Sequence, residues 1–284
     1  METGLGRRVA AIVFVLVLSP LHGKTPSHKS LDLRSSSALV LDQQTGELIF
    51  QKHPENVLPI ASITKLTTAM VVLDAHLNMD EAITIELEDV DMLRHSKSRL
   101  PVGTQLSRGE ALQLALMSSE NRAAHALGRT YPQGLSSFIA AMNAKTQSLG
   151  LAETHFVDPT GLSNENVSSA NDLARMVEAA YHYPQIRDFT TCDEAIIGGK
   201  RRPITFHNTN RLVRSPQWQI GLSKTGFIEE AGRCLVMQAS VAQRSVVIVL
   251  LDSVGKLTRF GDANRIKQWM EGMALLATVP KINQ

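Results

Sequence analysis

Apolar, strand-like runs near both ends of the chain are the feature that most constrains its fold. Near the N-terminus, "SALVLD" and "ELIFQK" flank the turn-like "QQTG", and near the C-terminus "RCLVMQASV" and "SVVIVLLDSV" flank "AQR". Each pair predicts a β-hairpin. Helical patterns are expected between them and after them, at 58–77, 107–119, 134–149, 171–182 and 259–277. A sheet built from both chain ends around a helical insertion is an α+β arrangement, in which the helices bury their apolar faces against the sheet.

The first residues indicate export. Two arginines precede an apolar run at 9–18, which is too short to span a bilayer. We therefore predict a signal peptide at 1–23, a polar lead-in at 24–36 and a single domain at 37–279. An uncleaved N-terminal anchor is the alternative, because no clean Ala-x-Ala cleavage site follows the apolar run.

Composition excludes several classes of function. The 284 residues are 43% apolar and 20% charged, as in ordinary globular proteins, and the net charge of +2 is scattered, which argues against nucleic-acid binding. The nine histidines show no metal-ligand spacing, and no phosphate loop or dinucleotide fingerprint occurs, so neither a metal nor a cofactor is expected. Cys192 and Cys234 are too few for a disulfide scaffold, and we expect no bridge between them.

The stretch "LPIASITKLTTAM" places Ser62 and Lys65 three residues apart at an expected helix start. Residues i and i+3 of a helix are neighbours, so a neutral Lys65 amine could take the Ser62 proton if burial lowers its pKa. The pair alone is a weak signal. Ser253 and Lys256 share the spacing at a strand end, and Ser62 could instead cap the helix.

Two further motifs strengthen the catalytic interpretation. "SSENRAAHAL" offers the Ser119 hydroxyl to relay a proton and the Asn121 amide to hold a substrate carbonyl. "LSKTGF" offers Lys224 and Thr225 to grip a carboxylate, and Gly226 lets a substrate backbone approach the strand. The three motifs, in this order, match those of the active-site serine enzymes that recognise penicillin.

From about residue 37 to residue 277 the chain resembles the low-molecular-mass penicillin-binding proteins, which are serine D-alanyl-D-alanine peptidases. It looks closest to their endopeptidase branch. The segments that carry the resemblance are "PIASITKLTTAMVVLDA", "LALMSSENRAA", "FVDPTGLSNENVSSANDLA", "HNTNRLV" and "KTGFIEEAGRCLVM". The resemblance implies a β-lactamase/transpeptidase-like fold, with an antiparallel sheet flanked by helices and a helical subdomain. It also implies a periplasmic enzyme that acts on peptidoglycan stem peptides and is acylated by β-lactam antibiotics.

The same resemblance implies roles for the reacting groups. Ser62 would be the acylated nucleophile and Lys65 its general base. Ser119 would relay protons towards the leaving amine, and Asn121 would contact the substrate amide. The backbone N–H groups of Ser62 and Phe227 would form the oxyanion hole.

Further residues are implied to bind the substrate. Lys224 would keep the site positive, Thr225 would hold the substrate carboxylate, and Gly226 would lie beside the substrate backbone. Arg259 is a second candidate for the carboxylate, and an exposed arginine at the start of the last helix is the alternative.

The reaction implied is attack on a D-alanine carbonyl, with expulsion of the diamino acid amine of a neighbouring stem. Glu120 stands in the second motif where many carboxypeptidases have glycine, which favours cross-link cleavage over D-alanyl-D-alanine carboxypeptidase activity. The chain ends shortly after its last expected helix, so we expect a soluble or loosely membrane-associated protein once the signal is removed.

Two other functions stay open. A β-lactamase needs a glutamate after the second motif to activate water, and Glu165 is the nearest candidate, although no asparagine follows it four residues later. A non-catalytic wall-binding protein would have no need for the nucleophile and its base.

Overall fold

The computed structural model describes residues 31–198 and 203–278. The predicted signal peptide at 1–23 lies outside these residues, as does most of the lead-in. None of the described helices combines the length and the hydropathy that a membrane span requires.

A five-stranded antiparallel sheet joins the two ends of the described chain. Its strand order is β2-β1-β11-β10-β9, so the N-terminal hairpin pairs directly with the C-terminal one. Both predicted hairpins are confirmed, and β9 adds an outer strand. The strands are β1 (Ser35–Asp42), β2 (Leu48–Lys52), β9 (Gln219–Ile228), β10 (Gly232–Val241) and β11 (Arg244–Ser253).

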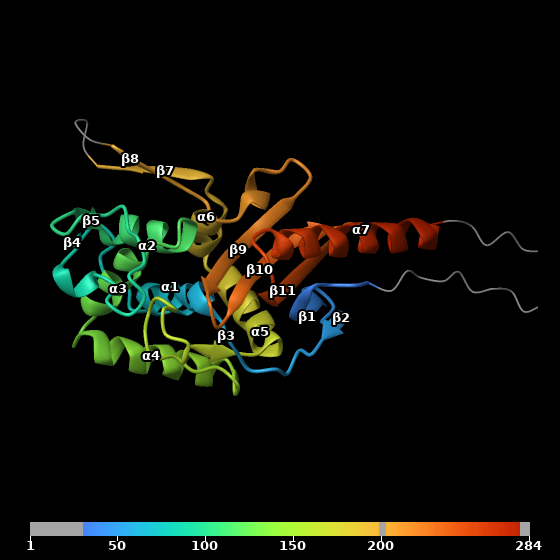
Figure 1. Cartoon of the computed structure of the whole chain (residues 1–284), viewed down its shortest axis with the longest axis horizontal. Coiled ribbons are helices and arrows are strands. Elements are labelled where there is room, and N and C mark those ends of the chain that lie inside the picture. The colour runs from blue at the N-terminus through green and yellow to red at the C-terminus, as the bar shows by residue number, and fades with distance from the viewer. Residues whose placement is uncertain (1–30, 199–202, 279–284) are drawn as a thin grey trace, which may run out of the picture. The chain divides into compact units, whose positions relative to one another are not determined.

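The central strands are buried on both faces, because helices cover each side of the sheet. Alternate residues point to opposite faces of a strand. Val247 and Val249 of β11 belong to the larger core, whereas Ile248 and Leu250 belong to a second core under the terminal helix α7 (Thr258–Thr278). Figure 1 shows α7 lying along the sheet.

The helices of the middle of the chain form the other side of the molecule. Helix α1 lies at their centre and contacts the next five helices, which is why all its residues from Lys65 to Val72 are buried. Helix α5 packs against β10 and β11 and so joins this group to the sheet. The helices are α1 (Lys65–Asp74), α2 (Arg108–Met117), α3 (Asn121–Arg129), α4 (Leu135–Ser148), α5 (Ala170–Tyr181) and α6 (Pro184–Thr191). The predicted α+β class is confirmed.

Two predicted helix starts carry the expected caps. The Ser107 side chain accepts from the Glu110 N–H at the start of α2, and Glu110 bonds back in a capping box. The Ser169 side chain accepts from the Asp172 N–H at the start of α5.

The predicted helix at 58–77 is wrong at both ends. Strand β3 (Leu58–Pro59) comes first, then the short 3₁₀ helix η1 (Ala61–Thr64), and α1 begins only at Lys65 and ends at Asp74. The cause at the start is tertiary: the Ile60 N–H donates to the Asn166 carbonyl, and Ala61 has a φ of 47°, which no regular helix allows. Ser62 therefore lies on a 3₁₀ turn.

Three short strand pairs and two further 3₁₀ helices complete the fold, and the sequence did not predict them. The strands are β4 (Ala82–Thr84), β5 (Gln105–Ser107), β6 (Val167–Ser168), β7 (Glu194–Ile197) and β8 (Ile204–His207), with pairs β3–β6, β4–β5 and β7–β8. The 3₁₀ helices are η2 (Leu87–Asp89) and η3 (Arg211–Arg214).

Candidate active site

Ser62 and Lys65 are in direct contact. Lys65 Nζ lies 2.9 Å from Ser62 Oγ, 2.8 Å from Asn121 Oδ1 and 2.6 Å from the Thr160 carbonyl oxygen. Ser62 does not cap α1, whose N-cap is Thr64. The capping alternative for Ser62 is therefore wrong.

Lys65 is completely buried, and among the described residues no carboxylate contacts its amine directly. Burial disfavours the charged amine and lowers the pKa of Lys65 from its usual 10.5 to about 7, although Asp158 and Glu120 oppose the fall through their negative charge. Near neutral pH a large share of Lys65 is thus an uncharged amine that can accept a proton.

The second motif joins the same cluster from the connection between α2 and α3. Ser119 has a φ of 61°, in the left-handed region, and its Oγ lies 2.9 Å from Lys224 Nζ. Asn121 is the first residue of α3, so its side chain reaches Lys65, and its Nδ2 donates to Ser96 Oγ at 2.9 Å. The left-handed backbone of Ser119 is strained, and such strain is found where a side chain must be directed at a functional site.

The third motif lies on β9, at the outer edge of the sheet. Lys224 pairs with Val236, a residue of the larger core, so both side chains point towards the helical side. Lys224 is buried, and its pKa falls well below the usual value because of that burial and of the nearby positive charges of Lys65 and Arg259. Thr225 Oγ1 donates to Thr209 Oγ1 at 2.7 Å.

Two glycines allow the backbone of other segments to come close to Ser62. A Cβ added at Gly161 would lie 1.9 Å from the Ala61 carbonyl oxygen and 2.9 Å from Ser62 N. A Cβ added at Gly226 would lie 2.8 Å from the Ile60 carbonyl oxygen and 3.2 Å from Ser62 N. Strand β9 therefore reaches the nucleophile at Gly226, and Phe227, the second predicted oxyanion residue, follows directly.

The loop at 158–166 supplies a contact that the sequence did not predict. The Asp158 carboxylate accepts from the backbone N–H groups of Thr160, Gly161 and Ser163, and this shape directs the Thr160 carbonyl at Lys65. The Asp-Pro and Gly pattern in "DPTGLS" signals a turn. A backbone carbonyl, however, has no sequence signature of its own.

Arg259 is buried, and the alternative of an exposed arginine is wrong. Its guanidinium carbon lies 4.6 Å from the centre of the Phe260 ring, and Nε and Nη1 have no hydrogen-bond partner among the described residues. Burial and the positive charge of Arg233 lower the pKa of Arg259 to about 10.

Comparison with known proteins identifies the family. The sequence profile described as D-alanyl-D-alanine carboxypeptidase matches residues 23–255. The chain belongs to the D-alanyl-D-alanine carboxypeptidase family. It is 48% identical to a D-alanyl-D-alanine endopeptidase of Pseudomonas aeruginosa and 45% identical to one of Escherichia coli, each over 84% of this chain and 78% of the relative. The predicted serine D-alanyl-D-alanine peptidase family is confirmed.

A solved structure of this fold agrees with the observed architecture. The crystal structure of the Streptomyces K15 DD-transpeptidase matches with a TM-score of 0.79 and 27% sequence identity, over 85% of this chain and 98% of that one. The predicted transpeptidase-like fold is confirmed.

Within this carboxypeptidase-family fold, Glu165 lies exposed on the 158–166 loop, and its backbone N–H donates to Ser163 Oγ. The acidic groups whose charge acts on Lys65 are Asp158, which is partly buried and shapes that loop, and Glu120, which is buried and caps α3. Both cysteines are free thiols. No group of three His, Cys, Asp or Glu residues in the described part of the chain is arranged to hold a metal.

Proposed function

We propose that the protein is a serine D,D-endopeptidase that cleaves D-alanyl–diaminopimelyl cross-links in peptidoglycan through an acyl-enzyme on Ser62. The observation that carries the proposal is the buried Lys65 amine, 2.9 Å from Ser62 Oγ and with a pKa near 7. The names of the 48% and 45% identical relatives support cross-link cleavage. We also propose that residues 37–279 act as one peptidase domain in the periplasm, soluble or loosely membrane-associated.

Acylation begins at the amine. A neutral lysine has two N–H donors and one lone pair. The Asn121 Oδ1 and Thr160 carbonyl oxygens can take the two donors, which leaves the lone pair for the Ser62 hydroxyl. The proton passes to Lys65 as the bond from Ser62 Oγ to the D-alanine carbonyl carbon forms. The N–H groups of Ser62 and Phe227 stabilise the oxyanion.

The tetrahedral intermediate then expels the amine. Ser119 Oγ, held by Lys224 Nζ at 2.9 Å, delivers a proton to the leaving nitrogen, and the proton that Lys65 took from Ser62 replaces it on Ser119, so that Lys65 is again a neutral amine. Water attacks the resulting ester with Lys65 again as base, which releases the acyl half and restores Ser62.

The leaving half carries a carboxylate, and several groups are proposed to bind it. Thr225 turns its hydroxyl from Thr209 to the carboxylate, Lys224 contributes charge, and Gly226 lets the substrate backbone pair with the outer edge of β9. Burial lowers the pKa of Lys224, and a bound carboxylate would favour its charged form. Nε and Nη1 of Arg259, which lack partners among the described residues, make it a further candidate.

D-Alanyl-D-alanine carboxypeptidase activity is the second candidate, and the burial of Arg259 favours it. The same groups that bind the diaminopimelyl carboxylate could bind a terminal D-alanine. β-Lactams, which present a carboxylate and a strained amide, would acylate Ser62 by the same steps.

The deciding experiment separates purified cross-linked muropeptide dimers and pentapeptide monomers by chromatography with mass detection after incubation with the protein. We expect dimers to fall to monomers, and the Ser62→Ala protein serves as the control. Trimming of pentapeptides without loss of dimers would move the assignment to carboxypeptidase. Rapid turnover of penicillin would instead support a β-lactamase.

The acylation rate should depend on pH through Lys65. Protonation removes the base, so the rate with a fluorescent penicillin should hold steady above about pH 8 and fall roughly tenfold per unit well below pH 7. The lowered pKa also means that Lys65 binds fewer protons in the folded state, so its contribution to stability rises between pH 7 and its unfolded pKa. Stopped-flow rates from pH 5 to pH 9, with circular dichroism at each pH, test this. A rate unchanged down to pH 5 would rule out Lys65 as the titrating base.

A further inference from the structure

The Arg94 side chain joins three segments at one end of the site. Its Nη2 lies 2.9 Å from each carboxylate oxygen of Glu230, just beyond β9, and its Nε donates to the Leu162 carbonyl. Arg94 itself belongs to a third segment, the loop at 91–96. None of the three catalytic motifs contains Arg94, Leu162 or Glu230.

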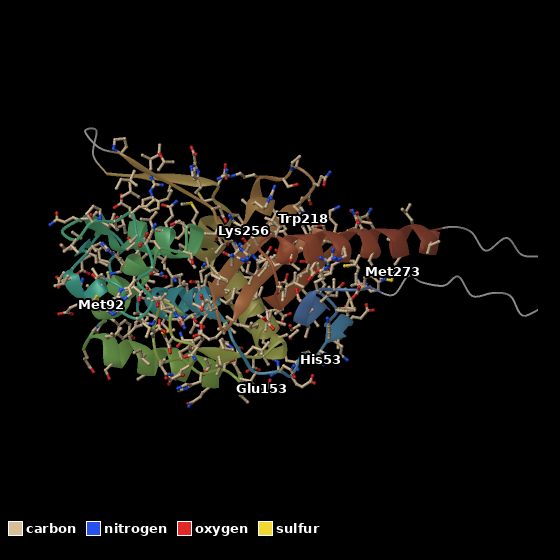
Figure 2. The ribbon with its side chains drawn as sticks, viewed as in Figure 1. His53, Met92, Glu153, Trp218, Lys256 and Met273 are labelled. Atoms are coloured by element: carbon tan, nitrogen blue, oxygen red, sulfur yellow. The ribbon has the colours of Figure 1, made fainter. Side chains whose placement is uncertain are left out.

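The 91–96 loop holds Arg94 in place. The Asp91 carboxylate accepts from the N–H groups of Leu93, Arg94 and Ser96, and Ser96 Oγ accepts from Asn121. The loop is thus fixed at one end to the catalytic cluster. Met92 of the same loop, labelled at the edge of the helical part in Figure 2, is 73% exposed. Arg94, in contrast, contacts Leu162 and Glu230.

The position of Arg94 relative to the substrate rests on the proposed function. Ser119 and Lys224 must lie on the side of the leaving amine, since Ser119 protonates it. The acyl half then runs the other way, between the end of β9 after Phe227 and the loop that carries Thr160. Leu162 follows Thr160 by two residues and Glu230 follows Phe227 by three, so Arg94, which bonds both, joins these two segments on the acyl side.

The Arg94 guanidinium keeps donors for a ligand. Of its five N–H groups, Nε is taken by Leu162 and Nη2 bonds Glu230, whereas no described residue accepts from Nη1. The side chain is 23% exposed. A fixed guanidinium with free N–H groups binds carboxylates, often through two parallel hydrogen bonds.

We infer that Arg94 is a specificity-determining residue that binds a carboxylate on the stem-peptide residues preceding the scissile D-alanine, with Leu162 and Glu230 holding its guanidinium in position. Glu230 competes for the same charge, so the gain for a carboxylate substrate is moderate. We expect a preference of about tenfold.

The test uses two synthetic stem-peptide dimers that differ only in a carboxylate or a carboxamide on the acyl half. Wild-type protein should cleave the carboxylate form with about tenfold higher kcat/KM. Arg94→Ala should lower kcat/KM for that form about tenfold and abolish the preference, whereas Glu230→Gln, which removes the competing charge, should keep or increase it. Lys97→Ala removes an exposed cation three residues further along the same chain and should match wild type.

Benzylpenicillin, whose side chain carries no carboxylate, separates recognition from structure. If Arg94 only braced the loops, its loss would slow acylation of Ser62 as much as peptide cleavage, and that result would overturn the inference. An unchanged preference in Arg94→Ala, or cleavage of both dimers equally by wild type, would also overturn it while leaving the proposed function intact. Failure of wild type on both dimers would remove the proposed function and this inference with it.

Discussion

Ser62→Ala and Lys65→Met should each lower the rate of acylation by a penicillin by at least about 10³-fold, and the double variant should be no slower than Ser62→Ala. The nucleophile and its base act as one unit, because the proton leaves Ser62 Oγ for the Lys65 nitrogen 2.9 Å away. Methionine nearly preserves the volume of the buried side chain but cannot accept the proton. Covalent labelling followed by intact mass measurement gives the rate for each variant.

The second Ser-x-x-Lys in the chain provides the matched control. Ser253 is buried at the end of β11, with Oγ 2.7 Å from Ser35 Oγ, and Lys256 is exposed at the turn that follows (Figure 2). Lys256→Met makes the same chemical change at the same spacing and should acylate at the wild-type rate. Thermal unfolding of each variant shows whether it is folded. A folded Lys65→Met protein with more than a tenth of the wild-type rate would contradict Lys65 as the base.

The sequence predicted the parts of the fold that depend on local pattern. The two hairpins follow from strand-like apolar runs joined by short turns, and the caps at Ser107 and Ser169 follow from side chains that bond within three residues. The three motifs also come together: Lys65 Nζ lies within hydrogen-bonding distance of Ser62 Oγ and of Asn121 Oδ1, and Lys224 Nζ lies 2.9 Å from Ser119 Oγ.

The remaining features depend on contacts that no local pattern encodes. Thr160 reaches Lys65 through a backbone carbonyl, 95 positions along the chain, and Thr209 bonds Thr225 hydroxyl to hydroxyl. The 3₁₀ turn at Ser62 arises because Asn166 accepts from the residue before Ala61. Arg259 is buried because α7 packs on the sheet. Helical periodicity alone did not reveal that the first turn of α7 would bury this side chain.

Gly161→Ala should both destabilise the protein and stop acylation, because its added methyl group has no room. Gly161 has a φ of 78°, and the new Cβ would lie 1.9 Å from the Ala61 carbonyl oxygen. The atoms it meets are backbone, so no side-chain rotation relieves the overlap, and either η1 or the 158–166 loop must move. Overlap of this kind typically costs about 1–3 kcal/mol, in addition to about 1–2 kcal/mol for the left-handed backbone.

Gly46→Ala measures the cost of the left-handed backbone alone, since Gly46 has a similar φ of 72° and a Cβ there would meet nothing within 4 Å. Urea unfolding should therefore show a loss of about 1–2 kcal/mol for Gly46→Ala and clearly more for Gly161→Ala. Acylation should separate the two variants further, because moving the loop withdraws the Thr160 carbonyl from Lys65 and moving η1 displaces Ser62 N. Equal stability losses with unchanged acylation would mean that the loop can yield without disturbing the nucleophile, and Thr160 would then have no part in holding the base.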